Sequence, residues 1–248
     1  MTEHYYSSDL EKAAIRGEPS MVWRAGQERR LAMIREYGKE SIKDRVLVDG
    51  TGIGAYQARL AQEARCVVGL DIELPRLLEA KANNQNLVCA AGEYLPFADG
   101  CFSAVLSNEV LEHVQDDRAA VEEASRVLAD GGRLVIFCPN RGYPFETHGI
   151  YRRGRYRFGN KLFVNYLPRK MRDRLAPHVR VYSRADMDAL LRGLPLIRET
   201  VCTIFGAYDN VIQKMPAAGK ALRGFLQWLE KTPLQRLGLS HFWVLRKE

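Results

Sequence analysis

The sequence predicts an α/β fold in which a doubly wound, mostly parallel sheet is covered by helices on both faces. Short apolar runs alternate with amphipathic segments along residues 45–140, as expected of strands buried on both faces and joined by helices. The first apolar run, 46–49, leads into three alternating glycines, Gly50, Gly52 and Gly54. This pattern is typical of a strand that turns tightly into a helix.

The expected elements follow one another in the order of such a fold. Residues Ala25–Tyr37 have a helical apolar face, and Gly38 ends it. Strands are expected at 46–49, 66–71, 87–90, 103–107 and 133–138, with helices at 56–63, 75–82 and 117–128. Asp116 or Asp117 can cap the last of these helices.

The pattern changes after residue 140. Residues 141–184 hold twelve Lys and Arg residues against two acidic residues, a net charge of +10, and the rest of the chain carries −3. Their poor periodicity predicts a basic insertion after strand five, which forms a lid or a substrate-binding segment. Such concentrated charge indicates either an anionic partner or a solvated basic face.

The C-terminal part predicts the edge of the sheet. Ser183 to Asp186 form a helix start, and strands are expected near 196–204 and 241–245. Between them lies a helix in which Leu222, Phe225, Leu226 and Leu229 share a face. Two strands joined by so long an excursion can pair antiparallel at the edge of the sheet.

The chain is therefore expected to form one domain over residues 1–248. Its parts are N-terminal helices at 1–44, a ligand-binding core at 45–140, the basic substrate or lid insertion at 141–184, and the C-terminal sheet and helices at 185–248. This length suits a single domain with additions.

Composition excludes several classes of protein. No apolar run reaches the roughly 20 residues that cross a bilayer, and the first residues lack the pattern of a secretory signal. The five cysteines are odd in number and show no C-x-x-C spacing, so neither a disulfide framework nor a metal site is expected. These features predict a cytoplasmic protein.

The glycine turn predicts a pocket for a cofactor that contains adenosine. A glycine turn at a helix start presents free N–H groups to a ligand, and Asp71, at the end of the second strand, can accept hydrogen bonds from ribose hydroxyls. Gly50, Gly52 and Ala55 satisfy a dinucleotide fingerprint, whereas Gly50, Gly52 and Gly54 fit the turn of enzymes that use S-adenosylmethionine. A third interpretation of the glycine turn is a tight loop that binds no ligand.

A more specific pattern follows in the middle of the core. Residues 92–102 read Gly-Glu-Tyr-Leu-Pro-Phe-Ala-Asp-Gly-Cys-Phe, and residues 111–114 read Leu-Glu-His-Val. These runs resemble class I S-adenosylmethionine-dependent methyltransferases, in particular the branch that includes quinone-biosynthesis methyltransferases. The resemblance covers roughly residues 44–140.

The resemblance implies a Rossmann-like, seven-stranded sheet with an antiparallel C-terminal strand, and S-adenosylmethionine as the cofactor. The implied cofactor-binding residues are Asp49, Gly50, Thr51, Gly52 and Gly54 at the turn, Asp71 and Ile72 at the ribose, Gly92 and Glu93 at the adenine, and Asn108 near the amino acid end. The sequence departs from the family pattern at three places. The acid usually found at the position of Val48 stands one residue later, at Asp49, and Ala91 replaces the aspartate before the adenine loop. Ser103-Ala104 stand where the family has an aspartate at the entry of strand four.

Methyl transfer to a hydroxyl group needs positioning and a general base. His148 is the predicted base, and Glu146 is expected to orient it or to contact the substrate, because both follow strand five directly. The expected acceptor is an oxygen of a small or lipid-linked, anionic molecule. The sequence leaves His113 as a residue that shapes the pocket.

Partners and alternatives remain open. The apolar stripe of Leu162, Phe163, Tyr166 and Leu167 beside basic residues suits peripheral contact with an anionic membrane, and nucleic acid is less favoured because no RNA-binding module is present. The alternative functions are an NAD(P)-binding oxidoreductase and a non-catalytic methyltransferase-like protein that binds anionic partners through residues 141–184.

Overall fold

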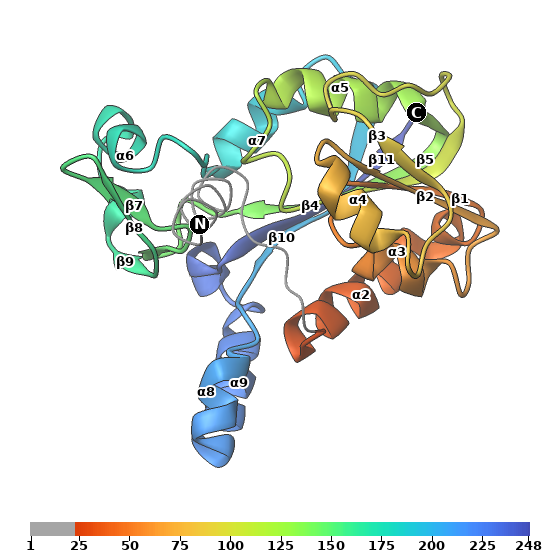
Figure 1. Ribbon diagram of the computed structural model, residues 1–248. Coiled ribbons are helices and arrows are strands. Elements are labelled where there is room, and N and C mark those ends of the chain that lie inside the picture. The colour runs from red at the N-terminus through yellow and green to blue at the C-terminus, as the bar shows by residue number, and fades with distance from the viewer. Residues whose placement is uncertain (1–22) are drawn as a thin grey trace, which may run out of the picture.

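The computed structural model describes residues 23–248, so the helices expected before residue 23 lie outside the described part. Its centre is a seven-stranded sheet in the order β10-β11-β5-β4-β1-β2-β3 (Figure 1). The strands are β1 (Arg45–Asp49), β2 (Cys66–Asp71), β3 (Leu87–Cys89), β4 (Phe102–Asn108), β5 (Leu128–Pro139), β10 (Leu196–Ile204) and β11 (Ser240–Lys247). The first five run parallel, and β11 is antiparallel to both β5 and β10. The predicted fold class, including the antiparallel C-terminal strand, is confirmed.

Helices cover both faces of the sheet and form two apolar cores. The helices are α2 (Ala25–Gly38), α3 (Ala55–Leu60), α4 (Leu74–Ala80), α5 (Asp117–Val127) and α7 (Arg184–Leu190). Leu47 packs with residues of α5 and α7, whereas its neighbours Val46 and Val48 pack with residues of α2 and α3. Successive strand residues point to opposite faces, so one apolar run supplies both cores.

The fifth strand begins earlier than predicted. β5 starts at Leu128, five residues before the expected Arg133, and its pairing with β4 shifts register between Phe102 and Ala104. Gly131 has a φ of 74°, which allows the irregularity at the point where the sequence reads as a turn.

The basic insertion lies outside the sheet, beside α7 (Figure 1). It contains β6 (Phe145–Glu146), β7 (Ile150–Arg152), β8 (Arg155–Arg157), β9 (Lys161–Leu162), the 3-10 helix η2 (Val164–Tyr166) and α6 (Arg169–Leu175). β6 pairs with β9 and β7 pairs with β8. We call residues 141–184 the lid.

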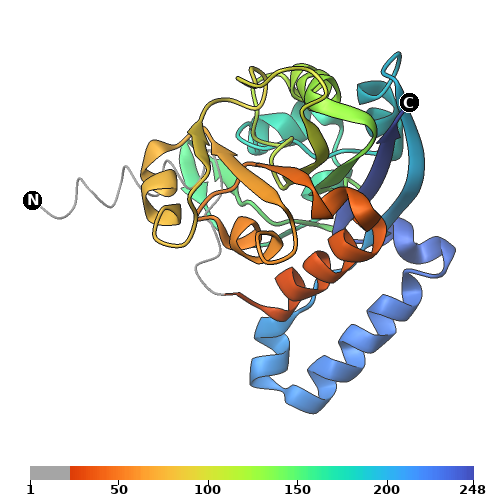
Figure 2. The same cartoon turned by 90° about the vertical axis from the view of Figure 1, so that its right-hand side faces the viewer.

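A second projection lies between β10 and β11. It consists of α8 (Asp209–Lys214) and α9 (Pro216–Leu229), followed by the 3-10 helix η3 (Pro233–Leu237), and it stands out from the body of the protein (Figure 2). The short 3-10 helix η1 (Lys39–Lys43) links α2 to β1. Within residues 23–248, no helix has the length and apolar character that a membrane span requires.

Candidate functional site

The glycine turn joins β1 to α3 in a conformation that other residues do not readily adopt. Gly50, Gly52 and Gly54 have φ values of 65°, 56° and 77°. A Cβ atom at Gly50 would lie 2.3 Å from Val110, and one at Gly54 would lie 2.2 Å from the amide of Asn84. Glycine is therefore required at both positions by backbone conformation and by space.

Asp71 is fixed directly beside this turn. The backbone N–H of Gly52 donates a hydrogen bond to Oδ2 of Asp71 (2.8 Å), and that of Glu73 donates to Oδ1 (2.9 Å). The turn is also attached to β2, because Thr51 N–H donates to the carbonyl oxygen of Leu70 (2.8 Å). Each carboxylate oxygen retains a lone pair for another donor, such as a ribose hydroxyl. The exposed side chain of Ile72 follows.

The side chain of Thr51 points into the protein. It is buried, and its hydroxyl donates to Oε1 of Gln57 (3.3 Å). The Gln57 amide in turn donates to the carbonyl oxygen of Asn86 (2.9 Å). Thr51 therefore connects the turn to α3, and its contact with a cofactor stays a prediction.

Asp49, at the end of β1, adds a second buried carboxyl group. Burial and the negative charges of Asp71 and Glu93 raise the pKa of Asp49 to about 7. A Cβ atom at Gly92 would lie 3.1 Å from this carboxyl group, so the glycine keeps the space beside it open. Neighbouring carboxyl groups of this kind favour a ligand that carries positive charge.

Glu93 has a structural role that the sequence did not indicate. Its Oε1 accepts hydrogen bonds from the backbone N–H groups of Gln115 (2.7 Å) and Asp116 (3.3 Å). Asp116 caps α5 by accepting from Ala119 N–H (3.0 Å), which confirms one of the two expected caps. Glu93 therefore holds the segment after β3 against the start of α5, and its contact with adenine stays a prediction.

The end of β4 carries an ion pair that the sequence did not reveal. Arg30 of α2 donates to Oδ1 of Asn108 (2.7 Å) and pairs with Glu109 (2.7 Å). Its guanidinium group lies over the ring of Phe137, 4.9 Å from the centroid. Although burial opposes ionisation of Glu109, Arg30 outweighs it and lowers the pKa of Glu109 to about 2. Arg30 therefore orients the amide of Asn108, the residue predicted to lie near the cofactor.

Glu112 is a second buried carboxyl group beside this one. Its side chain is fully buried next to Glu109. Burial and the charge of Glu109 raise the pKa of Glu112 well above its ordinary value. The negative charge of Glu109 therefore opposes ionisation of Glu112.

The structure brings Glu146 and His148 together, as required of the predicted base and its orienting residue. Oε1 of Glu146 lies 3.2 Å from Nδ1 of His148 and accepts from the His148 backbone N–H (2.9 Å). Oε2 of Glu146 accepts from Arg172 at 2.6 Å, and the two side chains are only 1% and 3% exposed. Burial would raise the pKa of Glu146, but His148 and Arg172 outweigh it and lower the pKa to about 2.

His148 faces the end of β4. Its ring meets that of His113 edge to face, with the centroids 5.5 Å apart. Glu112, His113 and His148 each offer a ligand atom, all within 4.8 Å of one another. A carboxylate and two imidazoles are donors that zinc and other transition metals accept. The sequence, judged by cysteine spacing, had indicated no metal ligands.

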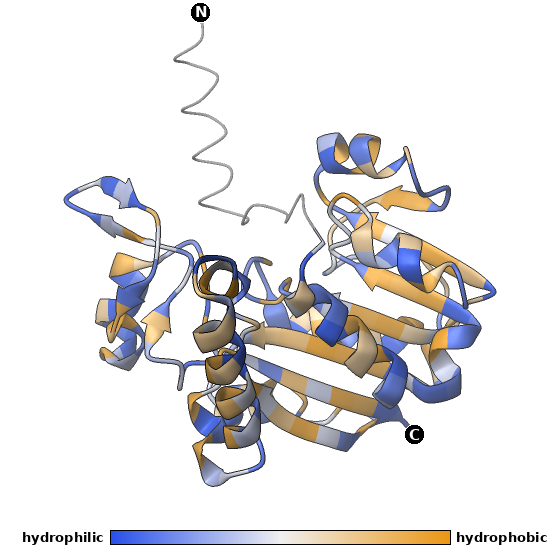
Figure 3. Cartoon of the chain, turned by 90° about the horizontal axis from the view of Figure 1, so that it is seen from below, coloured by the Kyte–Doolittle hydropathy of each residue, from blue (hydrophilic) through white to orange (hydrophobic). Residues whose placement is uncertain are grey.

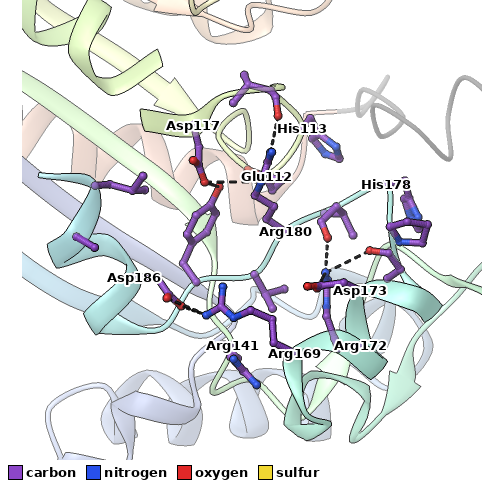
Figure 4. Close-up of a pocket in the computed structure, with 18 residues that line it drawn as sticks. Glu112, His113, Asp117, Arg141, Arg169, Arg172, Asp173, His178, Arg180 and Asp186 are labelled. Atoms are coloured by element: carbon purple, nitrogen blue, oxygen red, sulfur yellow. Dashed lines mark hydrogen bonds and ion pairs between the residues drawn. The ribbon is translucent and has the colours of Figure 1, made fainter. Parts of the chain in front are cut away.

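A cavity of about 610 Å³ opens between the lid, α7 and the start of α5 (Figure 4). Its charged lining residues are Glu112, Asp117, Arg141, Arg169, Arg172, Asp173, Arg180 and Asp186. His113 and His178 also line it, and Nε2 of His178 lies 3.1 Å from the carbonyl oxygen of His148. The predicted base His148 is not itself one of the lining residues, but two of them, His113 and His178, contact it.

Most of the positive charge at this cavity is paired. Arg169 bonds to both carboxylate oxygens of Asp186 (2.8 Å each), and Arg180 lies 3.7 Å from Asp117. Arg172 pairs with Glu146 as described. Arg141 instead donates to the backbone carbonyl oxygens of Asn165 and Leu167. These four of the twelve lid cations are thus bound within the protein, whereas most of the others are exposed, namely Arg152, Arg153, Arg155, Arg157, Lys170, Arg174 and Arg184.

Comparison with known proteins supplies the family. Residues 47–136 match the family described as "Methyltransferase domain". This is the segment that contains the glycine turn, Asp71 and the end of β4. Residues 47–136 therefore form a methyltransferase domain of the class I type that the sequence predicts.

Relatives of this methyltransferase match about half of it. The demethylmenaquinone methyltransferase of Corynebacterium kroppenstedtii is 33% identical over 128 residues, which cover 52% of this chain and 53% of that protein. That of Beutenbergia cavernae is 37% identical over 113 residues, covering 44% and 47%. The chain thus spans about half the length of the curated relatives it matches, and the match supports the predicted quinone-methyltransferase resemblance.

Solved structures show the same fold. An S-adenosylmethionine-dependent methyltransferase from Mesorhizobium loti has a TM-score of 0.62 at 18% identity, covering 90% of this chain and 98% of that one. The [4+2]-cyclase SpnF also has a TM-score of 0.62, at 15% identity, covering 98% and 94%. Because the cyclase is named for a different reaction, this fold does not by itself define the chemistry of the chain.

The donor groups of this methyltransferase fit S-adenosylmethionine. The cofactor contains a ribose and two positively charged groups, and the site offers the fixed carboxylate of Asp71, the buried Asp49 and the open space beside Gly92. The NAD(P) alternative fits less well, because the antiparallel β11 lies where a second parallel mononucleotide-binding half would continue the sheet.

Proposed function

We propose that this methyltransferase transfers a methyl group from S-adenosylmethionine to an oxygen atom of a small or lipid-linked acceptor bound under the lid. The observation that carries the proposal is the position of His148, which Glu146 holds against the ring of His113, a residue that lines the cavity. The relatives named demethylmenaquinone methyltransferase support the methyl transfer and a quinone-like acceptor.

The carboxyl ends of the parallel strands would hold the cofactor. We assign the ribose hydroxyls to Asp71, the methionine part to the backbone of Gly50 to Gly54, and the amino acid end to Asn108. Asp49 would lie close to the positive charge of the cofactor. When bound, S-adenosylmethionine supplies a methyl group on a positively charged sulfur, which is already electrophilic, so the protein contributes mainly by positioning the acceptor.

His148 would accept the proton of the attacking hydroxyl group. Its Nδ1 faces Glu146, so Nε2 is the nitrogen for the acceptor. The carboxylate of Glu146 is held in the charged state by Arg172, and a fixed negative charge stabilises the imidazolium that forms. The buried ion pair therefore fixes the orientation of the base.

The cavity would hold the acceptor. Its volume of about 610 Å³ suits a small molecule, and its paired charges do not demand a strongly anionic one. Arg141 donates hydrogen bonds to the backbone carbonyl oxygens of Asn165 and Leu167. We assign this arginine to a carboxylate or phosphate group of the acceptor. The exposed stripe of Leu162, Phe163 and Tyr166 leaves room for a lipid-linked acceptor at a membrane surface, and the cytoplasmic location stays a prediction.

The test is transfer of labelled methyl from S-adenosylmethionine to a panel of hydroxylated quinones and phenols. The His148→Ala variant is expected to lose about 100-fold in kcat, in line with the loss of a general base, while its affinity for S-adenosylhomocysteine is unchanged. The control is His178→Ala, which removes an imidazole that lines the cavity. Full turnover by His148→Ala would show that His148 is not the general base.

A further inference from the structure

The hairpin formed by α8 and α9 exposes an apolar surface away from the methyltransferase site. Met215, Phe225 and Trp228 are 59%, 55% and 57% exposed, and Val211 and Leu222 are exposed as well. Figures 1 and 2 show the hairpin standing out from the body, so the sheet does not cover this surface. Large apolar side chains gathered on one element mark an interaction site more often than scattered ones do.

The internal packing of the hairpin uses a different part of α9. A Cβ atom at Gly219 would lie 2.7 Å from Cα of Ile212, so the two helices approach closely at this glycine. Phe225 and Trp228 instead stack on each other, with centroids 5.9 Å apart and ring planes at 27°. Their rings form a preassembled aromatic surface that the hairpin itself leaves open.

The helix α9 is amphipathic in the manner of helices that lie in a membrane interface. At about 100° per residue, Leu222, Phe225 and Trp228 fall within about 120° of one another. Lys220 and Arg223 fall on the opposite half of the helix. A basic face opposite an apolar face with Trp and Phe is typical of helices that lie in the plane of the headgroups.

The net charge of the hairpin is positive. Residues 209–229 contain Lys214, Lys220 and Arg223 against one acid, Asp209, whose Oδ2 accepts a hydrogen bond from Gly26 N–H (3.3 Å) at the base of the hairpin. The acid that follows α9, Glu230, pairs with Arg29 and accepts from Phe205 N–H (2.7 Å), so it does not neutralise the three cations. The hairpin is thus attracted by an anionic surface and repelled by a second copy of itself.

We propose that the α8–α9 hairpin docks this methyltransferase on the surface of an anionic lipid bilayer, with Phe225 and Trp228 among the headgroups. The hairpin lies on the bilayer without spanning it, as its length requires. This inference is independent of methyl transfer, because no residue of the site lies on the hairpin. It places the protein where a lipid-linked acceptor is found.

The test is co-sedimentation of the full chain with vesicles. Vesicles of phosphatidylcholine alone are compared with vesicles of equal parts phosphatidylcholine and phosphatidylglycerol. We expect binding to the anionic vesicles that weakens at high salt, and a loss of at least about tenfold in Phe225→Ser/Trp228→Ser. Lys220→Glu/Arg223→Glu is expected to lose the preference for anionic lipid.

The matched control is Leu78→Ser/Ile197→Ser, which removes two exposed apolar side chains elsewhere and should bind vesicles like the wild type. Unchanged affinity for S-adenosylhomocysteine shows that each variant is folded. The inference is overturned if the wild type does not bind anionic vesicles, or if Phe225→Ser/Trp228→Ser binds as well as the wild type. It is also overturned if sedimentation velocity shows a wild-type dimer that this variant dissociates.

Discussion

The ion pair of Glu146 and Arg172 gives the sharpest energetic prediction, because it is buried and it also orients His148. Replacing Glu146 by Gln keeps the shape of the side chain but leaves the guanidinium of Arg172 without its buried counter-charge. Removing one partner of a buried pair costs about 3–5 kcal/mol. The pKa of Glu146, lowered from 4.5 to about 2, independently corresponds to about 3 kcal/mol.

Native-state hydrogen exchange measures this cost where it arises, in the lid. About 3 kcal/mol corresponds to roughly a hundredfold faster exchange for lid amides such as Ala176 N–H, which bonds to the carbonyl oxygen of Arg172. The control is Asp173→Asn, which removes the exposed carboxylate 3.5 Å from the same arginine and should change exchange little.

The pH dependence has a defined sign. Because the pKa of Glu146 is lowered on folding, its stabilisation is complete above about pH 4.5 and is lost as the pH falls towards 2. The advantage of the wild type over Glu146→Gln should therefore shrink in that window. Equal exchange in Glu146→Gln and wild type at neutral pH would refute the stabilising role of the pair.

Two further predictions concern the cofactor site. The pKa of Asp49 is about 7, so the affinity for the cationic cofactor should rise with pH up to about 7. Asp49→Asn should abolish this rise in calorimetric titrations. Because the pKa of Asp49 is raised on folding, the ligand-free wild type should also lose stability relative to Asp49→Asn as the pH rises from about 4 through 7. Gly50→Ala should destabilise the protein by about 1–3 kcal/mol in urea unfolding, because φ is 65° and the new Cβ would meet Val110 at 2.3 Å. A pH-independent affinity, or a fully stable Gly50→Ala, would contradict these assignments.

Local patterns in the sequence were sufficient for most of the sheet. The strands at 66–71 and 196–204 match β2 and β10 residue for residue, because short apolar runs bounded by polar residues define buried strands well. The start of α7 at Ser183 could also be predicted, because a helix cap depends on neighbouring residues. The hydroxyl of Ser183 accepts a hydrogen bond from Asp186 N–H (3.2 Å).

Contacts between distant segments could not be read in the same way. Arg30 and Asn108 meet across 78 positions, and nothing in the sequence marks this arginine among the others. Arg172 likewise appears as one more cation of a basic segment, although it is buried against Glu146. The spacing of Leu222 and Phe225 predicts a shared helix face but not that the face lies open to solvent, since amphipathic helices that pack and those that dock look alike.

The central claim is that an adenosyl sulfonium compound binds where the parallel strands end, with Asp71 at its ribose. Calorimetric titration with S-adenosylhomocysteine tests it most directly, with wild type and Asp71→Ala measured side by side and NAD as the competing ligand. The account predicts micromolar binding to the wild type, at least about tenfold weaker binding to Asp71→Ala, and no binding of NAD. Equal affinity in both proteins, or binding of NAD in place of S-adenosylhomocysteine, would contradict it.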